Sequence, residues 1–227
     1  MQRILSSVAV VVLAAGSAHA ASTIDFESGF SDQQAVGTVA LADNSVTFSV
    51  GDSLAVRGPA YVAEVGGQKT AFVGYGGGID TPEDLGVSGD FFLTDEEFVS
   101  DSFSKNYYIE FERAVSLLSL DLYDFCGDAG GGAGSMVTLT AYSDSFSTSA
   151  GTDTYTVPTP LPNEGNIVSL AVAGDPHILS ASVTFSTADT GTGIDNIQFS
   201  TIPAPAAAVL ASLGAGLVGW LRRRKTL

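Results

Sequence analysis

Apolar and polar residues alternate along five stretches in the middle of the chain. In the first stretch Val46, Phe48 and Val50 alternate with serine and threonine. A period of two places one set of side chains on a core and the other in water, which is typical of a half-buried β-strand. The five stretches are residues 45–50, 108–112, 118–122, 137–140 and 179–185. We expect each of them to form a strand of an antiparallel sheet.

Short apolar runs elsewhere predict more strands. They are Thr23–Glu27, Ala60–Val65, Thr70–Gly74, Asp90–Leu93, Asp153–Val157, Ile167–Val172 and Gly193–Ser200. About a dozen short strands joined by loops of Gly, Ser, Asp and Pro predict an all-β fold. The expected architecture is a single antiparallel β-sandwich, jelly-roll or Greek-key-like, over residues 21–201, and no internal repeat indicates a solenoid.

The first twenty residues have the pattern of a secretory signal peptide. Arg3 supplies a positive charge, and Val8–Ala15 is an apolar run of signal-peptide length that is too short to span a bilayer. Ala18 and Ala20 are small residues at the positions that a signal peptidase must accept. We therefore expect cleavage after Ala20, with an uncleaved anchor as the alternative.

Residues 202–227 have a different organisation. The prolines of Pro203-Ala204-Pro205-Ala206 favour an extended segment. The segment Ala207–Leu221 is apolar and ends beside a basic cluster, Arg222-Arg223-Arg224-Lys225, which should stay in the cytoplasm. This order predicts a C-terminal transmembrane helix with the rest of the chain outside the inner membrane. A plain, permanent C-terminal anchor is the alternative.

A proline motif, an apolar helix and a terminal arginine cluster, in that order, resemble the bacterial PEP-CTERM sorting signal, in particular its VPLPA-type variant. The family prefers Val at the position of Ile202 and Glu or Leu at that of Ala204. The resemblance covers about a tenth of the chain. It implies that an exosortase, a membrane-embedded cysteine transpeptidase, cuts at Pro203–Ala206 and passes the protein to the cell surface, so that the membrane anchor is transient.

The segment before this signal also resembles exported domains that carry a PEP-CTERM tail. The similar stretches are Ile24-Asp25-Phe26-Glu27, Val46-Thr47-Phe48 and Gly193-Ile194-Asp195-Asn196-Ile197-Gln198-Phe199. The resemblance implies a cell-surface or extracellular-matrix protein of a Gram-negative bacterium, associated with extracellular polysaccharide.

The net charge of the chain restricts the classes of partner that it can bind. The 227 residues contain 25 acidic and 9 basic side chains, for a formal charge of −16. Residues 21–201 hold all 25 acids but only four bases, which leaves 4 − 25 = −21. Such a domain cannot neutralise a run of phosphates, which argues against nucleic acid. It attracts cations instead.

Calcium is the cofactor that this composition favours, because Ca²⁺ takes six to eight oxygen ligands from carboxylates and carbonyls. Asp25 and Glu27 lie on one face of the first predicted strand, and Asp195 lies in the last. The first and last strands of a sandwich are often neighbours, so these three residues are the preferred ligands. Other candidate acids are Asp189, and the group Asp121, Asp124 and Asp128. A solvated acidic surface without calcium is the alternative.

The chain offers little for catalysis. His177 is the one histidine after the predicted signal peptide, and no Gly-x-Ser-x-Gly nucleophile elbow is present. The first hypothesis is therefore a non-enzymatic exported protein with a structural or adhesive role. A lectin-like carbohydrate-binding module, with or without calcium, is the second. A glycoside hydrolase that uses two facing carboxylates is the third.

Overall fold

The computed structural model describes residues 21–64, 91–94, 106–123, 134–158, 167–186 and 193–202, together with Gly214. Residues Ala20–Ile202 form a compact unit, and we describe this unit by itself. Its eleven described strands hold one hydrophobic core, as expected of a domain that folds independently.

The described strands range in length from three residues in β2 and β3 to nineteen in β10. They are β1 (Ala21–Ile24), β2 (Gln34–Val36), β3 (Thr38–Ala40), β4 (Ser45–Ser53), β5 (Val56–Glu64), β6 (Phe91–Thr94), β7 (Asn106–Tyr123), β8 (Met136–Tyr142), β9 (Ser149–Thr156), β10 (Ile167–Phe185) and β11 (Gly193–Thr201). The predicted strand Thr70–Gly74 lies outside the described residues.

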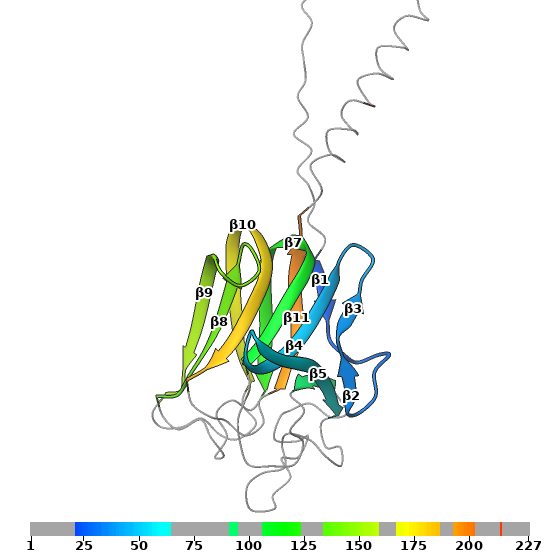
Figure 1. Ribbon diagram of the computed structural model, residues 1–227, viewed down its shortest axis with the longest axis vertical. Coiled ribbons are helices and arrows are strands. Elements are labelled where there is room, and N and C mark those ends of the chain that lie inside the picture. The colour runs from blue at the N-terminus through cyan, green and yellow to red at the C-terminus, as the bar shows by residue number, and fades with distance from the viewer. Residues whose placement is uncertain are drawn as a thin grey trace, which may run out of the picture. The chain divides into compact units, whose positions relative to one another are not determined.

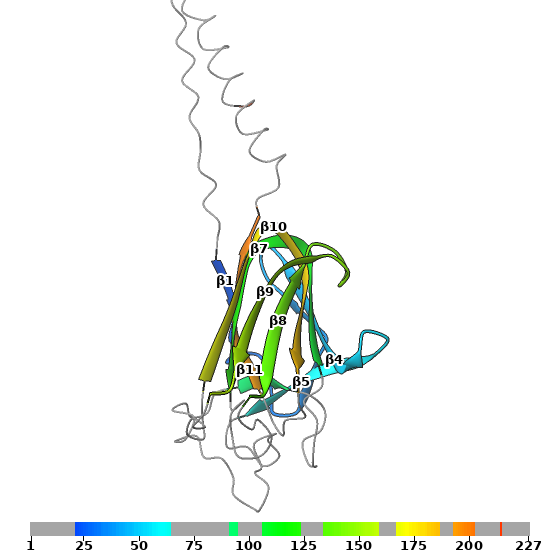
Figure 2. The same ribbon diagram turned by 90° about the vertical axis from the view of Figure 1, so that its left-hand side faces the viewer.

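Hydrogen-bonded pairing closes five of these strands into a barrel. The ring runs β11–β6–β5–β4–β7 and returns to β11, and its pairs are antiparallel. β1 extends the sheet from β11, whereas β10, β8 and β9 extend it from β7, and β2 and β3 add to β5 and β4. The prediction of an all-β antiparallel domain is confirmed, but the closed ring was not foreseen. Figures 1 and 2 show the strands curving around a common interior.

The two longest strands, β7 and β10, each pair with different strands along different parts of their length. The first half of β7 pairs with β4, through Val46↔Phe111, and its second half pairs with β11, through Phe199↔Leu118. β7 therefore joins the stretches 108–112 and 118–122 into one strand. β10 similarly joins the predicted strand Ile167–Val172 to the stretch 179–185, and its register with β7 shifts between Ala173 and Ile178.

The bend in β7 is held by a buried side chain from another part of the chain. Asn44 lies between β3 and β4 and contacts the backbone of Arg113, just after the segment that pairs with β4. Its Nδ2 donates to the Arg113 carbonyl at 3.0 Å, and its Oδ1 accepts from the Arg113 N–H at 2.9 Å. These two bonds satisfy backbone groups at the point where β7 leaves one partner strand for the next.

The core is largely the one that the alternation predicts. Val46, Phe48, Leu118, Leu120 and Val183 are all buried. Along 179–185, however, the expected pattern is wrong at its first position. Leu179 is 36% exposed because an irregularity between Ile178 and Ser180 shifts the alternation of β10. The serines expected in water on this strand, Ser180 and Ser182, are buried.

Candidate functional site

Asp195 is a buried carboxylate that is only half satisfied. It lies on β11 directly opposite Asp121 of β7 and is 3% exposed. Its Oδ2 accepts a hydrogen bond from the Tyr123 hydroxyl at 3.0 Å. Its Oδ1 has no hydrogen-bond partner within the described part of the chain. A buried polar atom without a partner is costly, so this oxygen marks a position where a ligand or a proton would be stabilised.

A local irregularity in β11 gives Asp195 its orientation. Asn196 has a positive φ of 49°, and the pairing with β7 shifts register between Asp195 and Gln198. Asparagine tolerates this left-handed conformation better than most residues. The Asn196 side chain then donates to Asp121 Oδ2 at 3.1 Å and to the Tyr123 hydroxyl oxygen at 3.4 Å. These bonds form a polar network around Asp195.

Asp121 completes the network from β7. Its Oδ1 accepts a 2.6 Å hydrogen bond from the Ser169 hydroxyl of β10, and its Oδ2 accepts from Asn196. Both oxygens of Asp121 therefore have protein donors, whereas Asp195 keeps one oxygen without one. Asp124 and Asp128, predicted as partners of Asp121, lie outside the described residues, as does Asp189.

Asp25 and Glu27 follow β1 and lie close to Asp195. β1 pairs with β11 through Ile24↔Ile197, so the next residues continue alongside the segment that carries Asp195. The Glu27 N–H donates to Asp25 Oδ1 at 3.3 Å, and Glu27 Oε1 accepts from the Phe91 N–H of β6 at 3.2 Å. The first strand lies beside the last, as predicted, but β1 ends at Ile24, so Asp25 and Glu27 lie after it rather than on one face of it.

Burial and charge both act on the Asp195 carboxyl. Burial raises the pKa of Asp195 to about 7, and the negative charges of Glu27 and Asp25 act in the same direction. The Asn196 backbone N–H and the Tyr123 hydroxyl oppose this pKa shift. Within the described ranges, no three His, Cys, Asp or Glu side chains are already grouped as a metal centre. The three predicted calcium ligands are thus not assembled into a metal-binding group in this structure.

A second feature is the connection between β8 and β9, residues 143–148, which contacts residues of β7, β8 and β10. Asp144 accepts hydrogen bonds from the hydroxyl and the backbone N–H of both Ser147 and Thr148. The bonds from Ser147 and Thr148 lower the pKa of Asp144 well below its usual range. The buried Ser180 hydroxyl accepts from the Phe146 N–H at 3.1 Å and donates to the Asp144 carbonyl. The loop is therefore fixed at both ends.

Phe146 occupies the centre of this loop in a strained conformation. Its φ is 63°, which is uncommon for a bulky side chain. The half-buried ring packs edge-on against Tyr108 at 5.5 Å and against Tyr142 at 5.7 Å between centroids. Tyr108 is consequently only 5% exposed, although its position in the alternating pattern faced water.

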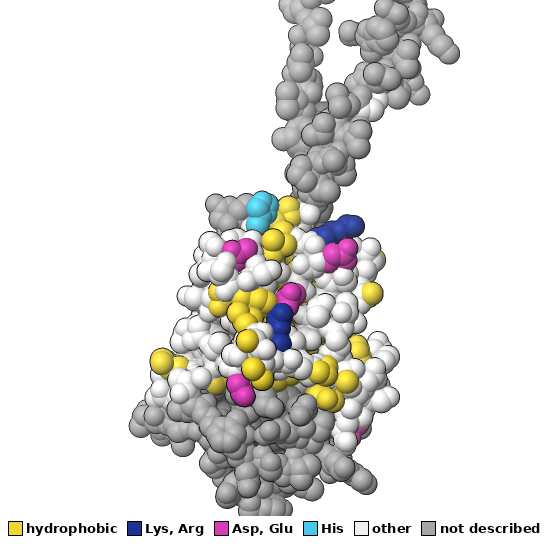
Figure 3. Space-filling model, in the orientation of Figure 1, with side chains coloured by type: hydrophobic (Ala, Val, Ile, Leu, Met, Phe, Trp, Pro, Cys, Tyr) yellow, Lys and Arg dark blue, Asp and Glu magenta, His cyan; other side chains and the backbone are white. Residues whose placement is uncertain are grey.

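Arg57 of β5 joins this group of rings. Its guanidinium lies 5.5 Å from the Phe146 ring centre and 5.7 Å from that of Tyr108, and its Nη1 pairs with Glu110 Oε1 at 2.7 Å. We call the five side chains the Phe146 patch: Arg57, Tyr108, Glu110, Tyr142 and Phe146. Figure 3 shows hydrophobic side chains beside a basic and an acidic side chain near the middle of this face.

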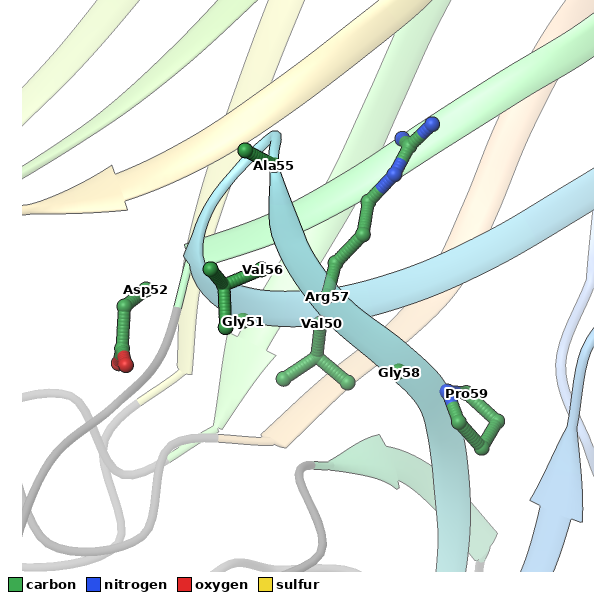
Figure 4. Close-up of a pocket in the computed structure, with 8 residues that line it drawn as sticks. All are labelled: Val50, Gly51, Asp52, Ala55, Val56, Arg57, Gly58 and Pro59. Carbon is green, nitrogen blue, oxygen red and sulfur yellow. The ribbon is translucent and has the colours of Figure 1, made fainter.

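A hollow of about 260 Å³ lies next to the Phe146 patch, within the β4–β5 hairpin. It is lined by Val50, Gly51, Asp52, Ala55, Val56, Arg57, Gly58 and Pro59 (Figure 4). The two strands cross closely at Gly51, where a Cβ atom would lie 2.0 Å from the Val56 carbonyl oxygen. Glycine thus permits the crossing that brings Arg57 to the patch.

The Phe146 patch was not predicted from the sequence. The spacing of Asp144, Ser147 and Thr148 is a turn signal, but nothing in it indicates which aromatic rings the loop covers. The remaining predicted site residues lie outside the described part of the chain. They are Ala18, Ala20, Pro203, Ala204, Pro205, Ala206, Arg222, Arg223, Arg224 and Lys225. Among the described residues, no helix has the length and apolarity needed to cross a membrane.

Comparisons with known proteins give distant likenesses only. No family model and no curated protein matches the chain. Among solved structures, the K2 cleaved adhesin domain of Lys-gingipain aligns with 79% of this chain and 99% of its own, at 12% identity and a TM-score of 0.43. The enzymatically active domain of tailspike protein 4 of bacteriophage CBA120 aligns with 71% of this chain and 20% of its own, at 16% identity and a TM-score of 0.29. Neither likeness carries an argument about function.

Proposed function

We propose that this chain is a non-enzymatic exported protein whose β-domain, residues 21–201, has an adhesive role at the cell surface or in the extracellular matrix. The observation that supports an adhesive role is the Phe146 patch. A signal peptidase would remove residues 1–20, and an exosortase-like transpeptidase would act at Pro203–Ala206. The apolar tail would hold the protein in the inner membrane only until that step.

The construction of the Phe146 patch favours binding over simple packing. A left-handed backbone at a non-glycine residue costs about 1–3 kcal/mol, and such strain clusters at functional positions. Here Asp144 and Ser180 hold the strained loop in place, and the Phe146 ring stays half-buried rather than fully covered. A rigid ring at the surface loses little conformational entropy on binding, which is how aromatic anchors contribute to protein interfaces.

A lectin-like role is the second candidate, with extracellular polysaccharide as the partner. Binding pockets for small ligands combine aromatic walls with a few fixed polar groups. The Phe146 patch offers aromatic edges beside the ion pair of Arg57 and Glu110, and Arg57 also lines the adjoining hollow. A sugar ring has an apolar face and hydroxyls at its edge, which this combination could contact together.

Replacing Phe146 by asparagine tests the adhesive role. Asparagine accepts the positive φ, so the loop should persist while the ring is lost. We expect the purified domain to bind at least about tenfold more weakly to matrix from the producing cells, which corresponds to about 1.4 kcal/mol for one anchor. Leu117→Asn, which removes an exposed apolar side chain of β7 outside the patch, should leave binding unchanged.

Unchanged matrix binding by Phe146→Asn would contradict the proposed role of the patch. A glycan array probed with the same variants distinguishes the two candidates. Binding of one glycan class that is lost with Phe146 supports the lectin-like role. Matrix binding that depends on Phe146, without any glycan signal, supports a protein-directed adhesive role.

Processing of both ends gives a separate prediction. Mass spectrometry of the protein recovered from the cell surface should find its N-terminus at Ala21 and its C-terminus close to Pro203–Ala206. The reason is the order of proline motif, apolar segment and basic cluster in residues 202–227. Recovery of an intact Arg222–Leu227 peptide from surface protein would instead indicate a permanent membrane anchor.

A further inference from the structure

We infer that Asp195 is a ligand of a divalent cation, calcium in preference to magnesium, bound where the end of β1 meets β11. The cation would be shared with the carboxylates of Asp25 and Glu27. It would tie the segment after the first strand to the last strand. This inference does not depend on the adhesive role proposed above, because it concerns a different part of the domain.

The first supporting observation is the orphaned oxygen. Asp195 is buried, its Oδ2 is held by the Tyr123 hydroxyl, and its Oδ1 lacks a hydrogen-bond partner among the described residues. Asp195 also forms no ion pair with any Lys, Arg or His that the structure describes. A buried carboxylate of this kind is stabilised by a proton or by a positive partner, and a metal ion can serve as that partner.

The second observation is that two further carboxylates, just after β1, act electrostatically on Asp195. Asp25 and Glu27 are close enough for their charges to act on Asp195, and the pairing of β1 with β11 fixes this neighbourhood. The three acids come from opposite ends of the domain, 168 residues apart between Glu27 and Asp195 by their numbering (195 − 27). Holding like charges together is unfavourable unless a cation neutralises them.

Calcium suits this arrangement better than magnesium. Ca²⁺ accepts six to eight oxygens in flexible geometry, whereas Mg²⁺ demands a near-ideal octahedron. Because the described carboxylates are not already closed into a metal centre, water and backbone carbonyls must complete the shell. Extracellular calcium modules of this open kind bind at about 0.1–1 mM, and we expect an affinity in that range.

Tyr123 and Asn196 are positioning residues in this scheme. The Tyr123 hydroxyl holds Asp195 Oδ2, and the Asn196 side chain contacts both that hydroxyl and Asp121. Oriented donors around a metal-binding carboxylate typically contribute 10–100-fold to affinity, as an order-of-magnitude expectation. Tyr123→Phe should therefore weaken calcium binding by about tenfold while leaving the ion preference unchanged.

Thermal unfolding of the domain Ala21–Ile202 tests the site. Calcium chloride at 10 mM should raise the Tm by about 3–10 °C above magnesium chloride or sodium chloride at matched ionic strength. Asp195→Asn should abolish this calcium increment, since the amide removes the charge with little change of shape. Asp52→Asn, which removes an exposed acid of β4, should retain it.

Two results would overturn the inference. The first is an equal Tm shift in all three salts, which indicates general screening of an acidic domain. The second is a calcium increment that survives in Asp195→Asn. Should that variant fail to fold, the double variant Asp25→Asn/Glu27→Gln changes exposed side chains only, and calorimetric titration with calcium chloride should then show at least tenfold weaker binding. Unaltered binding by the double variant would also contradict the site.

Discussion

Asp195→Asn is expected to stabilise the domain in calcium-free buffer at pH 8 and to have little effect at pH 4. Burial raises the pKa of Asp195 from 3.8 to about 7 in the folded state, with the charges of Glu27 and Asp25 adding to the shift. Folding therefore favours the protonated carboxyl. At pH 4, close to the ordinary pKa of 3.8, the unfolded chain still holds part of its own Asp195 proton, so the folded protein keeps its proton at little cost.

The sign of the pH dependence follows from this raised pKa. As the pH rises from about 4 to about 7, the unfolded chain loses its Asp195 proton before the folded one does, so the free energy of unfolding falls. About three pKa units correspond to at most about 4 kcal/mol. Asparagine mimics the protonated acid at every pH, so the free energy of unfolding of the variant does not fall in this way as the pH rises. Tyr123 and Asp121 face Asp195 from β7 and remain in both proteins.

Urea unfolding between pH 4 and pH 8, with chelator present, measures this effect. The difference in unfolding free energy between Asp195→Asn and the unaltered domain should grow by a few kcal/mol across the range. Asp52→Asn serves as the control, and its curve should run parallel to that of the unaltered domain. Parallel curves for Asp195→Asn as well would show that Asp195 is not the group responsible.

The second large effect is expected from Asn44→Ala. The Asn44 side chain is 4% exposed and satisfies both the N–H and the carbonyl of Arg113. Alanine leaves these two backbone groups without their partner at the bend of β7. Both bonds are only part-buried, and a typical hydrogen bond contributes about 0.5–1.5 kcal/mol, so we expect a loss of about 1–3 kcal/mol in unfolding free energy.

A graded variant separates this hydrogen-bonding role from simple packing. Asn44→Asp keeps an acceptor for the Arg113 N–H but offers no donor to the Arg113 carbonyl when ionised. We expect a substantial loss of stability for this variant as well, measured by the same urea titration. Because the shape of the side chain is conserved, that loss would come from the missing hydrogen bond and not from packing. A change within about 0.5 kcal/mol for Asn44→Ala would mean that the bend does not depend on Asn44.

The class of fold and most of the core could be read from local pattern. Alternation at Val46–Val50 and at Leu118–Leu122 predicts which side chains are buried, because a strand repeats every two residues whatever it pairs with. The same pattern placed Asp25 and Glu27 on one face and suggested Asp195 as their neighbour. The pairing of β1 with β11 places the first and last strands side by side, although β1 ends before Asp25 and Glu27.

Features that depend on which strands meet were not predictable in this way. Stretches 108–112 and 118–122 form one strand, β7, which pairs with β10 in both, and Asn44 satisfies backbone groups between them. The sheet closes into a barrel because β6 pairs with both β5 and β11, and a period of two says nothing of partners.

Local sequence patterns are enough to predict an antiparallel β-domain with a strongly acidic composition and two terminal segments of separate character. The environments of its polar groups depend instead on how the strands pair and pack. The irregularity at Asn196 is accompanied by a buried, half-satisfied Asp195, and the loop at Asp144 brings Phe146 over Tyr108. Burial, pKa and ring contacts arise from residues far apart in the chain, so no local pattern contains them.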